Sequence, residues 1–353
     1  MSVSRMKNVH VLIPDLFLPQ ELAKEVCAGL ELPALETILA RSQSAPLPAA
    51  TMEAWLCTVF GAADGAIAPI TLHGDGIDPG AAYWLRADPV HLNLQRDQLI
   101  LQSDVRLSAD EAAQLCASMN HHFAADGLKF FAPHPQRWYL QLENTPDVLT
   151  CPLAQVSGRG IRTKLPQGPD ATRWHRVFNE VQMLFFEHTV NLAREARGEL
   201  PVNSIWLWGG GRAGARLNQP YRQIWSDNDL VAAFARQAGV THAAMPDDIA
   251  AALPETDGEI LLYWDSLQLA LQYADLQAWR SSLQLFEEYI AAPLLSALRT
   301  GQIAQLTLDV VQTEDAQNSR ASQRFVLSRN SLWKLWRRRR PLARWAGAGQ
   351  VPV

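Results

Sequence analysis

Residues 187–212 read EHTVNLAREARGELPVNSIWLWGGGR and decide which fold the sequence predicts. The segment begins at the end of a helix, passes through a turn into a short apolar strand, and leaves that strand through three glycines and Arg212. Open α/β sheets use this order of helix, strand and glycine loop to bring backbone amides and a cation to the carboxyl edge of the sheet. We therefore expect an α/β fold with this loop at a candidate site.

Strand and helix patterns alternate along most of the remaining chain. Residues 9–13 form an apolar, β-branched run that ends at Pro14-Asp15. Later runs at 259–264 and 303–310 also predict buried strands, the last carrying Asp309 near its end. Repeated βα units predict a doubly wound, mainly parallel sheet. At the end of the first strand, Asp15 is either a polar ligand at the carboxyl edge or the cap of the following helix.

A different pattern occupies residues 87–145. Two pairs of strands flank a helix that opens with a capping box at Ser108. This block predicts a small α+β module inserted in the larger domain. We expect residues 1–86 and 146–330 to form the two parts of the α/β domain, and residues 331–353 to form a basic-aromatic tail.

Composition sets broad limits on the class of protein. The chain has 353 residues, a formal net charge of −5 and 48% hydrophobic residues. This charge gives no global attraction to nucleic acid. The absence of an apparent signal peptide or a run of roughly 20 apolar residues predicts a cytoplasmic protein. Four cysteines without a CxxC pair predict reduced, buried side chains rather than a zinc site: Cys27, Cys57, Cys116 and Cys151.

The 187–212 segment resembles the signature of the archaeal-type cofactor-independent phosphoglycerate mutases, within the alkaline phosphatase superfamily. That signature is approximately His-Pro-Val-Asn, an Arg and a Gly, then Pro-Ala-Asn-x-Ile-Trp-Leu-Trp-Gly-x-Gly. Thr189 and Val202 depart from it. The residues that match in the same order are His188, Val190, Asn191, Arg194, Gly198, Pro201, Asn203, Ile205, Trp206, Leu207, Trp208, Gly209 and Gly211. The resemblance implies an alkaline-phosphatase-like fold with an inserted α+β module.

Other segments extend the resemblance. Residues 13–15 look like the family's first strand, residues 88–120 are similar to its inserted module, and residues 290–298 resemble the helix after a metal-binding loop. The tryptophan- and arginine-rich stretch at 333–345 is similar to the tail of a degenerate bacterial branch, the RpfE-type regulatory proteins. The resemblance therefore favours that branch.

The family's reaction, as the resemblance implies it, needs two divalent metals and a Ser or Thr nucleophile. Asp15 matches the first metal ligand. In the stretch Leu32-Pro33-Ala34-Leu35-Glu36, a leucine occupies the position of the nucleophile. Asp15 is therefore at most a vestigial catalytic residue in this reading.

The later metal ligands that the resemblance implies are also missing. Gln268 and Gln272 stand where Asp and His would bind metal, and Val310 follows Asp309 where the family has His. No histidine occurs after His242. Because a neutral amide cannot offset two dications, we expect no bound metal and no cofactor. Two divalent metals such as manganese are expected only if the site has been rearranged.

The glycine-rich end of the segment is a candidate anion site. Backbone N–H groups of a glycine loop can cradle a phosphate. Alternatively, these residues persist because the turn and the strand need them, and the sequence leaves both readings open. The anion-binding candidates are Asn191, Arg194, Asn203, Gly209, Gly210, Gly211 and Arg212.

The tail contains SLWKLWRRRRPLARW at residues 331–345. Its four consecutive arginines suit anionic lipid headgroups, nucleic-acid phosphates or an acidic protein surface. We expect Trp333 and Trp336, one helical turn apart, to pack on the domain, whereas the arginines either stay in water or contact one of these anionic partners. The candidate contact residues are Arg337, Arg338, Arg339 and Arg340.

Three functional hypotheses follow. The first is a non-catalytic phosphoglycerate-mutase-like protein that acts as a cytoplasmic regulatory or anionic-ligand-binding module, with a small phosphorylated molecule as its ligand. The second is an active metal-dependent phosphomutase or phosphatase whose rearranged site uses Asp15, Asp309 and ligands that the pattern does not reveal. The third, compatible with the first, is an interaction protein that docks its basic tail on a membrane, a nucleic acid or an acidic partner.

Overall fold

The fold is described from a computed structural model of the chain. It describes residues 7–49, 51–63, 65–95, 97–214, 216–313, 322–334 and 336–345. The chain divides into two compact units, each with its own sheet. Unit 1 contains Met1–Phe60 and Leu217–Val353, and unit 2 contains Gly61–Arg216. None of the described helices is long and apolar enough to cross a membrane.

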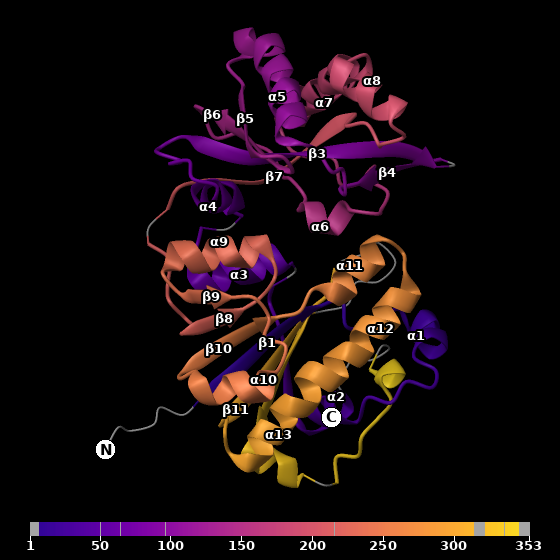
Figure 1. The fold of residues 1–353 in the computed structure, drawn as a ribbon, viewed down its shortest axis with the longest axis vertical. Coiled ribbons are helices and arrows are strands. Elements are labelled where there is room, and N and C mark those ends of the chain that lie inside the picture. The colour runs from indigo at the N-terminus through magenta and orange to yellow at the C-terminus, as the bar shows by residue number, and fades with distance from the viewer. Residues whose placement is uncertain are drawn as a thin grey trace. The chain divides into compact units, whose positions relative to one another are not determined.

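Unit 1 is built on a mainly parallel sheet, which confirms the predicted fold class (Figure 1). Within the described residues this sheet has seven strands in the order β2-β12-β11-β1-β10-β8-β9. The five strands from β11 to β9 are parallel, and β12 and β2 continue the β11 edge in antiparallel pairing. Their bounds are β1 Asn8–Pro14, β2 Gln43–Pro46, β8 Gln223–Trp225, β9 Thr241–Ala243, β10 Glu259–Tyr263, β11 Gln305–Val311 and β12 Gln323–Ser328.

The core of unit 1 follows the two-residue period of β1. Val9, Val11 and Ile13 are buried in one apolar cluster with residues of the helices on that face. His10 lies on the opposite face, where its ring contacts Trp55 of α3 edge-on at 5.4 Å. The α-helices of unit 1 are α1 Gln20–Val26, α2 Pro33–Arg41, α3 Met52–Phe60, α9 Asp229–Ala238, α10 Ile249–Ala252, α11 Ser266–Gln272, α12 Leu276–Phe286 and α13 Ala292–Thr300.

Prolines and caps set the ends of these helices. Pro33 is the first residue of α2, as expected from its fixed φ. Before Pro293, a π-helical turn at Glu287–Ala291 separates α12 from α13. The sequence did not reveal an earlier break between α11 and α12, where the Asp275 side chain caps α12 by accepting from Ala278 N at 2.8 Å.

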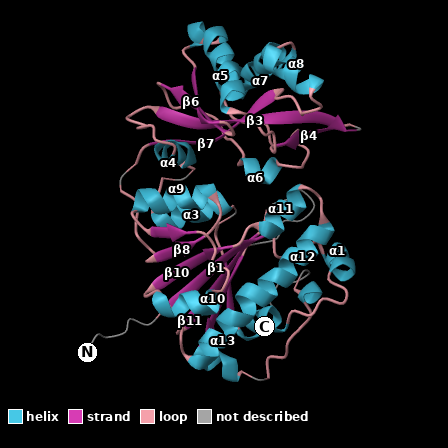
Figure 2. Ribbon diagram, viewed as in Figure 1, coloured by secondary structure: helices cyan, strands magenta, loops and turns pink. Residues whose placement is uncertain are grey.

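Unit 2 contains an antiparallel sheet with helices packed on it (Figure 2). The predicted capping box is present, because Ser108 and Glu111 bond each other's backbone N–H groups at the start of α5. The strands are β3 Tyr83–Gln95, β4 Gln98–Gln102, β5 Lys129–His134, β6 Arg137–Leu142 and β7 Ser204–Arg212. The α-helices are α4 Ile67–Gly74, α5 Ala109–His122, α6 Leu153–Val156, α7 Ala171–Phe186 and α8 Thr189–Ala196.

The 187–212 segment occupies a different place from the one we predicted. It lies in unit 2, where β7 pairs antiparallel with β3 from Tyr83–Arg212 to Val90–Ser204. The prediction that its glycine end reaches the carboxyl edge of the parallel sheet is therefore wrong. Because β7 joins the second sheet, unit 2 extends over residues 61–216, well beyond the predicted module at 87–145.

All four cysteines are free. Cys57 and Cys116 are buried as expected, whereas Cys27 and Cys151 are only half-buried. Burial raises the pKa of the Cys116 thiol to about 11. Each cysteine belongs to the packing of its own unit, and none of them forms a disulfide.

Candidate functional site

Asp15 lies at the carboxyl edge of the unit 1 sheet, directly after the last residue of β1. The residue is buried and has a positive φ of 54°, an uncommon conformation for a residue other than glycine. Its carboxylate accepts hydrogen bonds from Thr313 N and Thr313 Oγ1, both at 2.8 Å. It does not cap α1, whose N-cap residue is Pro19 with no side-chain cap. Asp15 therefore joins the ends of β1 and β11.

Gln268 of α11 completes a cluster with Asp15 and Thr313, called here the Asp15 cluster. Its side chain is buried, and its Nε2 donates to Thr313 Oγ1 at 3.5 Å. Gln272 lies one turn later on the same helix. The resemblance had placed Gln268 at a metal-ligand position. In the structure the Thr313 hydroxyl lies between the two side chains: it accepts from Gln268 and donates to Asp15.

The donor set of the Asp15 cluster does not fit two divalent cations. Hard cations prefer several carboxylate or carbonyl oxygens, and divalent transition metals also accept imidazole. Here Asp15 supplies the carboxylate, while Thr313 and Gln268 supply an alcohol and an amide. Across the described residues, no group of three or more His, Cys, Asp or Glu side chains could hold a metal ion. Among the described residues at this edge, the side chains do not match the ligands that a two-metal mechanism needs.

Three further ionisable residues lie near this edge without forming a ligand set. Burial raises the pKa of Glu53 and of Asp265, and Asn228 partly opposes this for Asp265 through a 2.9 Å hydrogen bond. Burial and the charges of Asp265, Glu53 and Asp15 raise the pKa of Tyr263 well above its ordinary value. The Tyr263 hydroxyl has no hydrogen-bond partner among the described residues. In all three groups, burial shifts the pKa in the direction that favours the protonated form.

Asp309 has a separate role in the middle of β11. It pairs in register with Leu12, three residues before Asp15, so the backbone positions of Asp309 and Asp15 are offset by about 10 Å along the strands. Its fully buried carboxylate accepts from Arg324 Nε at 2.7 Å and Nη2 at 2.6 Å, and from Trp55 Nε1 at 2.7 Å. Its contacts are therefore those of an ion pair in which the carboxylate is fully buried and the Arg324 side chain is 39% exposed.

His10 extends this ion pair into a network that the sequence did not reveal. Its Nε2 lies 2.9 Å from Asp309 Oδ2, and its Nδ1 lies 2.8 Å from the Tyr221 hydroxyl. Burial alone would raise the pKa of Asp309, but the hydrogen bonds from Arg324, His10 and Trp55 lower it to about 2. A histidine at an alternate position of an apolar strand was the available signal, since it marked a polar spot on one face of β1.

The N-terminus of α2 is also occupied by a side chain. The Glu287 carboxylate, from the π-helical turn, accepts from Ala34 N at 2.6 Å and Leu35 N at 2.9 Å. Glu287 is itself buried. Free N–H groups at a helix N-terminus attract anions, and here an acidic side chain provides that anion. The sequence offered no local signal for this contact, because Glu287 follows Ala34 by 253 residues.

The polar anion-binding candidates of the 187–212 segment are engaged with nearby backbone. Asn191 Nδ2 donates to Phe185 O at 2.8 Å and Val202 O at 2.7 Å, and its Oδ1 accepts from Val202 N. Asn203 bonds both backbone groups of Leu92. These contacts match the reading in which the turn and the strand need the two asparagines.

Arg194 and Arg212 are engaged in the same way. Arg194 is buried, and its guanidinium donates to the carbonyls of Leu200 and Arg106 and pairs with Glu111 at 3.1 Å. Arg212 donates to the carbonyls of Ala81 and Glu143. The charge of Arg194 is therefore paired with Glu111 within unit 2, whereas Arg212 is exposed and donates to uncharged carbonyls.

The three glycines continue strand β7 rather than forming a loop. A Cβ atom on Gly209 would lie 2.9 Å from Ile67 Cβ, and one on Gly211 would lie 2.6 Å from Ala66 Cα. A Cβ on Gly210 would clash with the Tyr83 hydroxyl. Glycine is required here by the close approach of α4 and β3. Anion binding by this group stays a prediction, and these contacts give it no support.

The tail differs from our expectation. Trp333 and Trp336 do not pack on the domain; their exposed fractions are 76% and 75%. Trp333 ends a 3-10 turn at Arg329–Trp333 and Trp336 lies beyond it, so the two do not share a helical face. Arg337 donates to Ser42 O at 2.7 Å. The four consecutive arginines are exposed: Arg337, Arg338, Arg339 and Arg340.

Sequence comparison connects this chain with one group of enzymes, although no protein-family model matches it. It is 28% identical over 149 residues to a probable 2,3-bisphosphoglycerate-independent phosphoglycerate mutase of Geobacter sulfurreducens, covering 41% of this chain and 37% of that protein. It is 24% identical over 221 residues to the 2,3-bisphosphoglycerate-independent phosphoglycerate mutase of Methanothrix thermoacetophila, covering 57% and 56%. The chain is a distant relative of the cofactor-independent phosphoglycerate mutases.

The extent of this relationship is limited. The matched segments span between about a third and just over half of the length of these two phosphoglycerate mutases. A solved structure of a Pyrococcus horikoshii protein resembles this one with a TM-score of 0.51 and 11% identity, covering 92% of this chain and 88% of that one. That likeness concerns the fold.

Proposed function

We propose that this chain is a non-catalytic phosphoglycerate-mutase-like protein that acts in the cytoplasm as a regulatory or anionic-ligand-binding module. The donor chemistry of the Asp15 cluster carries this proposal. Asp15 already accepts two hydrogen bonds from Thr313, and Gln268 contributes a neutral amide. Metal-assisted phosphoryl transfer needs cations that activate the nucleophile and stabilise the transferring group. This set of side chains is a poor match for that task.

The segment at the implied nucleophile position supports the same proposal. Leu32 is buried and has no nucleophilic atom. The backbone N–H groups of Ala34 and Leu35, at the start of α2, donate to the Glu287 carboxylate. A helix N-terminus is a favourable place for a phosphate group. In this chain an internal carboxylate takes that place.

The regulatory part of the proposal rests on the similarity of the tail to the RpfE-type proteins, and the ligand part rests on the relatives. Those relatives are named as phosphoglycerate mutases. Phosphoglycerate is therefore the first ligand to test, with inorganic phosphate as the smaller comparison.

Two measurements on the full chain test this function. Isothermal titration calorimetry with 3-phosphoglycerate measures binding, and mutase and phosphatase assays with added Mn²⁺ measure turnover. We expect binding without turnover. Turnover that disappears in an Asp15→Asn variant would contradict the proposal. Absence of both binding and turnover would retain the non-catalytic assignment and remove the ligand-binding one.

A further inference from the structure

The tail of unit 1 is fixed to the domain at its start. Arg41 of α2 donates through Nη1 to Leu332 O at 2.8 Å. Arg337 donates in the other direction, through Nη1 to Ser42 O at 2.7 Å. These two bonds hold the segment on either side of Trp333 and Trp336.

A second set of contacts fixes the end of the tail. Leu342 is buried in the core of unit 1, and its N–H donates to Glu36 Oε1 at 3.2 Å. The Trp345 ring packs edge-on against Phe325 with 5.9 Å between the ring centroids. The segment between these anchors is therefore held at the surface of unit 1.

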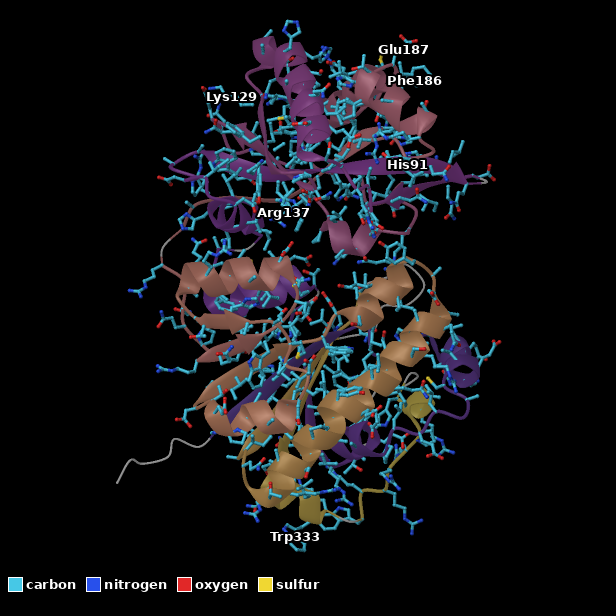
Figure 3. The ribbon with its side chains drawn as sticks, in the orientation of Figure 1. His91, Lys129, Arg137, Phe186, Glu187 and Trp333 are labelled. Atoms are coloured by element: carbon cyan, nitrogen blue, oxygen red, sulfur yellow. The ribbon has the colours of Figure 1, made fainter. Side chains whose placement is uncertain are left out.

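Between the anchors, the tail presents apolar and cationic side chains to solvent. Trp333 and Trp336 are more than 70% exposed, and Figure 3 shows the Trp333 side chain pointing away from the ribbon. We define the tail surface as the exposed side chains of Trp333, Trp336, Arg338, Arg339 and Arg340. Of its arginines, Arg339 lies near enough to Glu36 to lower the pKa of that carboxyl, against the larger effect of burial.

The charge of this segment is opposite to that of the whole chain. Residues 331–345 contain one lysine, five arginines and no acidic residue, whereas the whole chain has a formal net charge of −5. Exposing two indole rings to water has no benefit for stability. A partner that is both anionic and apolar at its surface would satisfy the two kinds of side chain together.

We propose that the tail surface docks this protein on a membrane that contains anionic lipids. Indole rings sit well at the level of the lipid headgroups, and arginines pair with their phosphates. Stable yet reversible attachment needs an apolar contribution and a basic patch, and the tail surface supplies both. Non-specific binding to single-stranded nucleic acid uses a charged groove that follows the backbone, and the tail surface is instead a short exposed segment between two anchors.

The test uses co-sedimentation of the full chain with vesicles of phosphatidylcholine alone or mixed with phosphatidylglycerol. We expect binding to the mixed vesicles only. A variant with Arg338→Gln, Arg339→Gln and Arg340→Gln should lower the partition coefficient about 100-fold, because each surface cation contributes roughly fivefold. The Trp333→Ala, Trp336→Ala variant should lower it at least about tenfold, because indole burial is lost.

The matched control is Met183→Ala with Phe186→Ala, two residues of α7 with exposed fractions of 78% and 77%. This variant removes a similar exposed apolar pair outside the tail and should bind vesicles like the unmodified chain. Thermal unfolding of each variant checks that the fold is retained. The proposal is overturned if the chain does not bind the mixed vesicles, if the tail variants bind as well as the control, or if an oligonucleotide competes the chain off the vesicles through the same arginines.

Discussion

At the scale of single residues, the buried carboxylate of Asp309 contributes its charge to stability. Its folded pKa of about 2 lies below the ordinary value of 3.8. Because the folded pKa is depressed, the ionised carboxylate stabilises the fold above about pH 4, and this contribution is lost as the pH falls toward about 2. The difference corresponds to about 2 kcal/mol. We expect urea unfolding to show this loss of stability across that pH range.

An Asp309→Asn substitution tests the same contact at neutral pH. Arg324 and His10 would lose their anionic partner, so we expect the free energy of unfolding to fall by about 3 kcal/mol. Asp257→Asn is the matched control. Asp257 is 78% exposed, and its ion pair with Lys7 is long, at 3.7 Å. Equal effects of the two substitutions would contradict the assigned role of Asp309.

Asn191 distinguishes a structural role from an anion-binding role in the 187–212 segment. Its three hydrogen bonds to Phe185 and Val202 are buried. We therefore expect Asn191→Ala to lower the free energy of unfolding by about 1–3 kcal/mol, measured by chemical denaturation. Phosphate affinity, measured by calorimetry, should not change. Unchanged stability together with weaker phosphate binding would favour the anion pocket.

At the scale of elements, the close packing of β7 on α4 explains the glycine run. Gly211→Ala would place a Cβ 2.6 Å from Ala66 Cα, a backbone atom that cannot rotate away. We expect this substitution to lower the free energy of unfolding, measured by chemical denaturation, by about 1–3 kcal/mol. Gly214→Ala is the control, since a Cβ there meets nothing within 4 Å. If Gly211→Ala leaves the free energy of unfolding unchanged, the close approach of Gly211 to Ala66 is contradicted.

The helix start at α2 gives a second prediction at this scale. Glu287→Ala removes the acceptor for two backbone N–H groups, on Ala34 and Leu35. The expected loss in the free energy of unfolding is about 1–3 kcal/mol. The neighbouring Glu288 is exposed, so Glu288→Ala should have almost no effect. Circular dichroism during thermal unfolding of both variants measures the difference.

At the scale of the whole molecule, the local patterns predicted most of unit 1. The β-branched run before Pro14 became β1, and Pro33 and Pro293 lie in the first turns of α2 and α13, where the fixed φ of proline is tolerated. Strand pairing was the weak point. Nothing local in 187–212 shows that β7 pairs with β3, more than a hundred residues earlier, rather than with a parallel neighbour. The order of helix and strand along the chain is the same whether the strand pairs antiparallel with β3 or joins a parallel sheet.

The candidate site shows the same division between local and distant information. Residue types alone indicated that Gln268 could not replace an acidic metal ligand, and the structure places it beside Thr313. The contacts of Glu287 with α2 and of Arg324 with Asp309 depend on tertiary packing. The prediction that Trp333 and Trp336 pack on the domain was wrong. A spacing of three residues predicts a shared helical face, but the helical turn ends at Lys334, between the two tryptophans.

We propose that this phosphoglycerate-mutase-like fold does not carry a two-metal centre at Asp15. Elemental analysis of the full chain, equilibrated with excess Mn²⁺ and then dialysed, tests it most directly. The donor set of Asp15, Thr313 and Gln268 predicts well below one manganese per chain, with no difference in an Asp15→Asn variant. Two manganese ions per chain that are lost in the Asp15→Asn variant would contradict it.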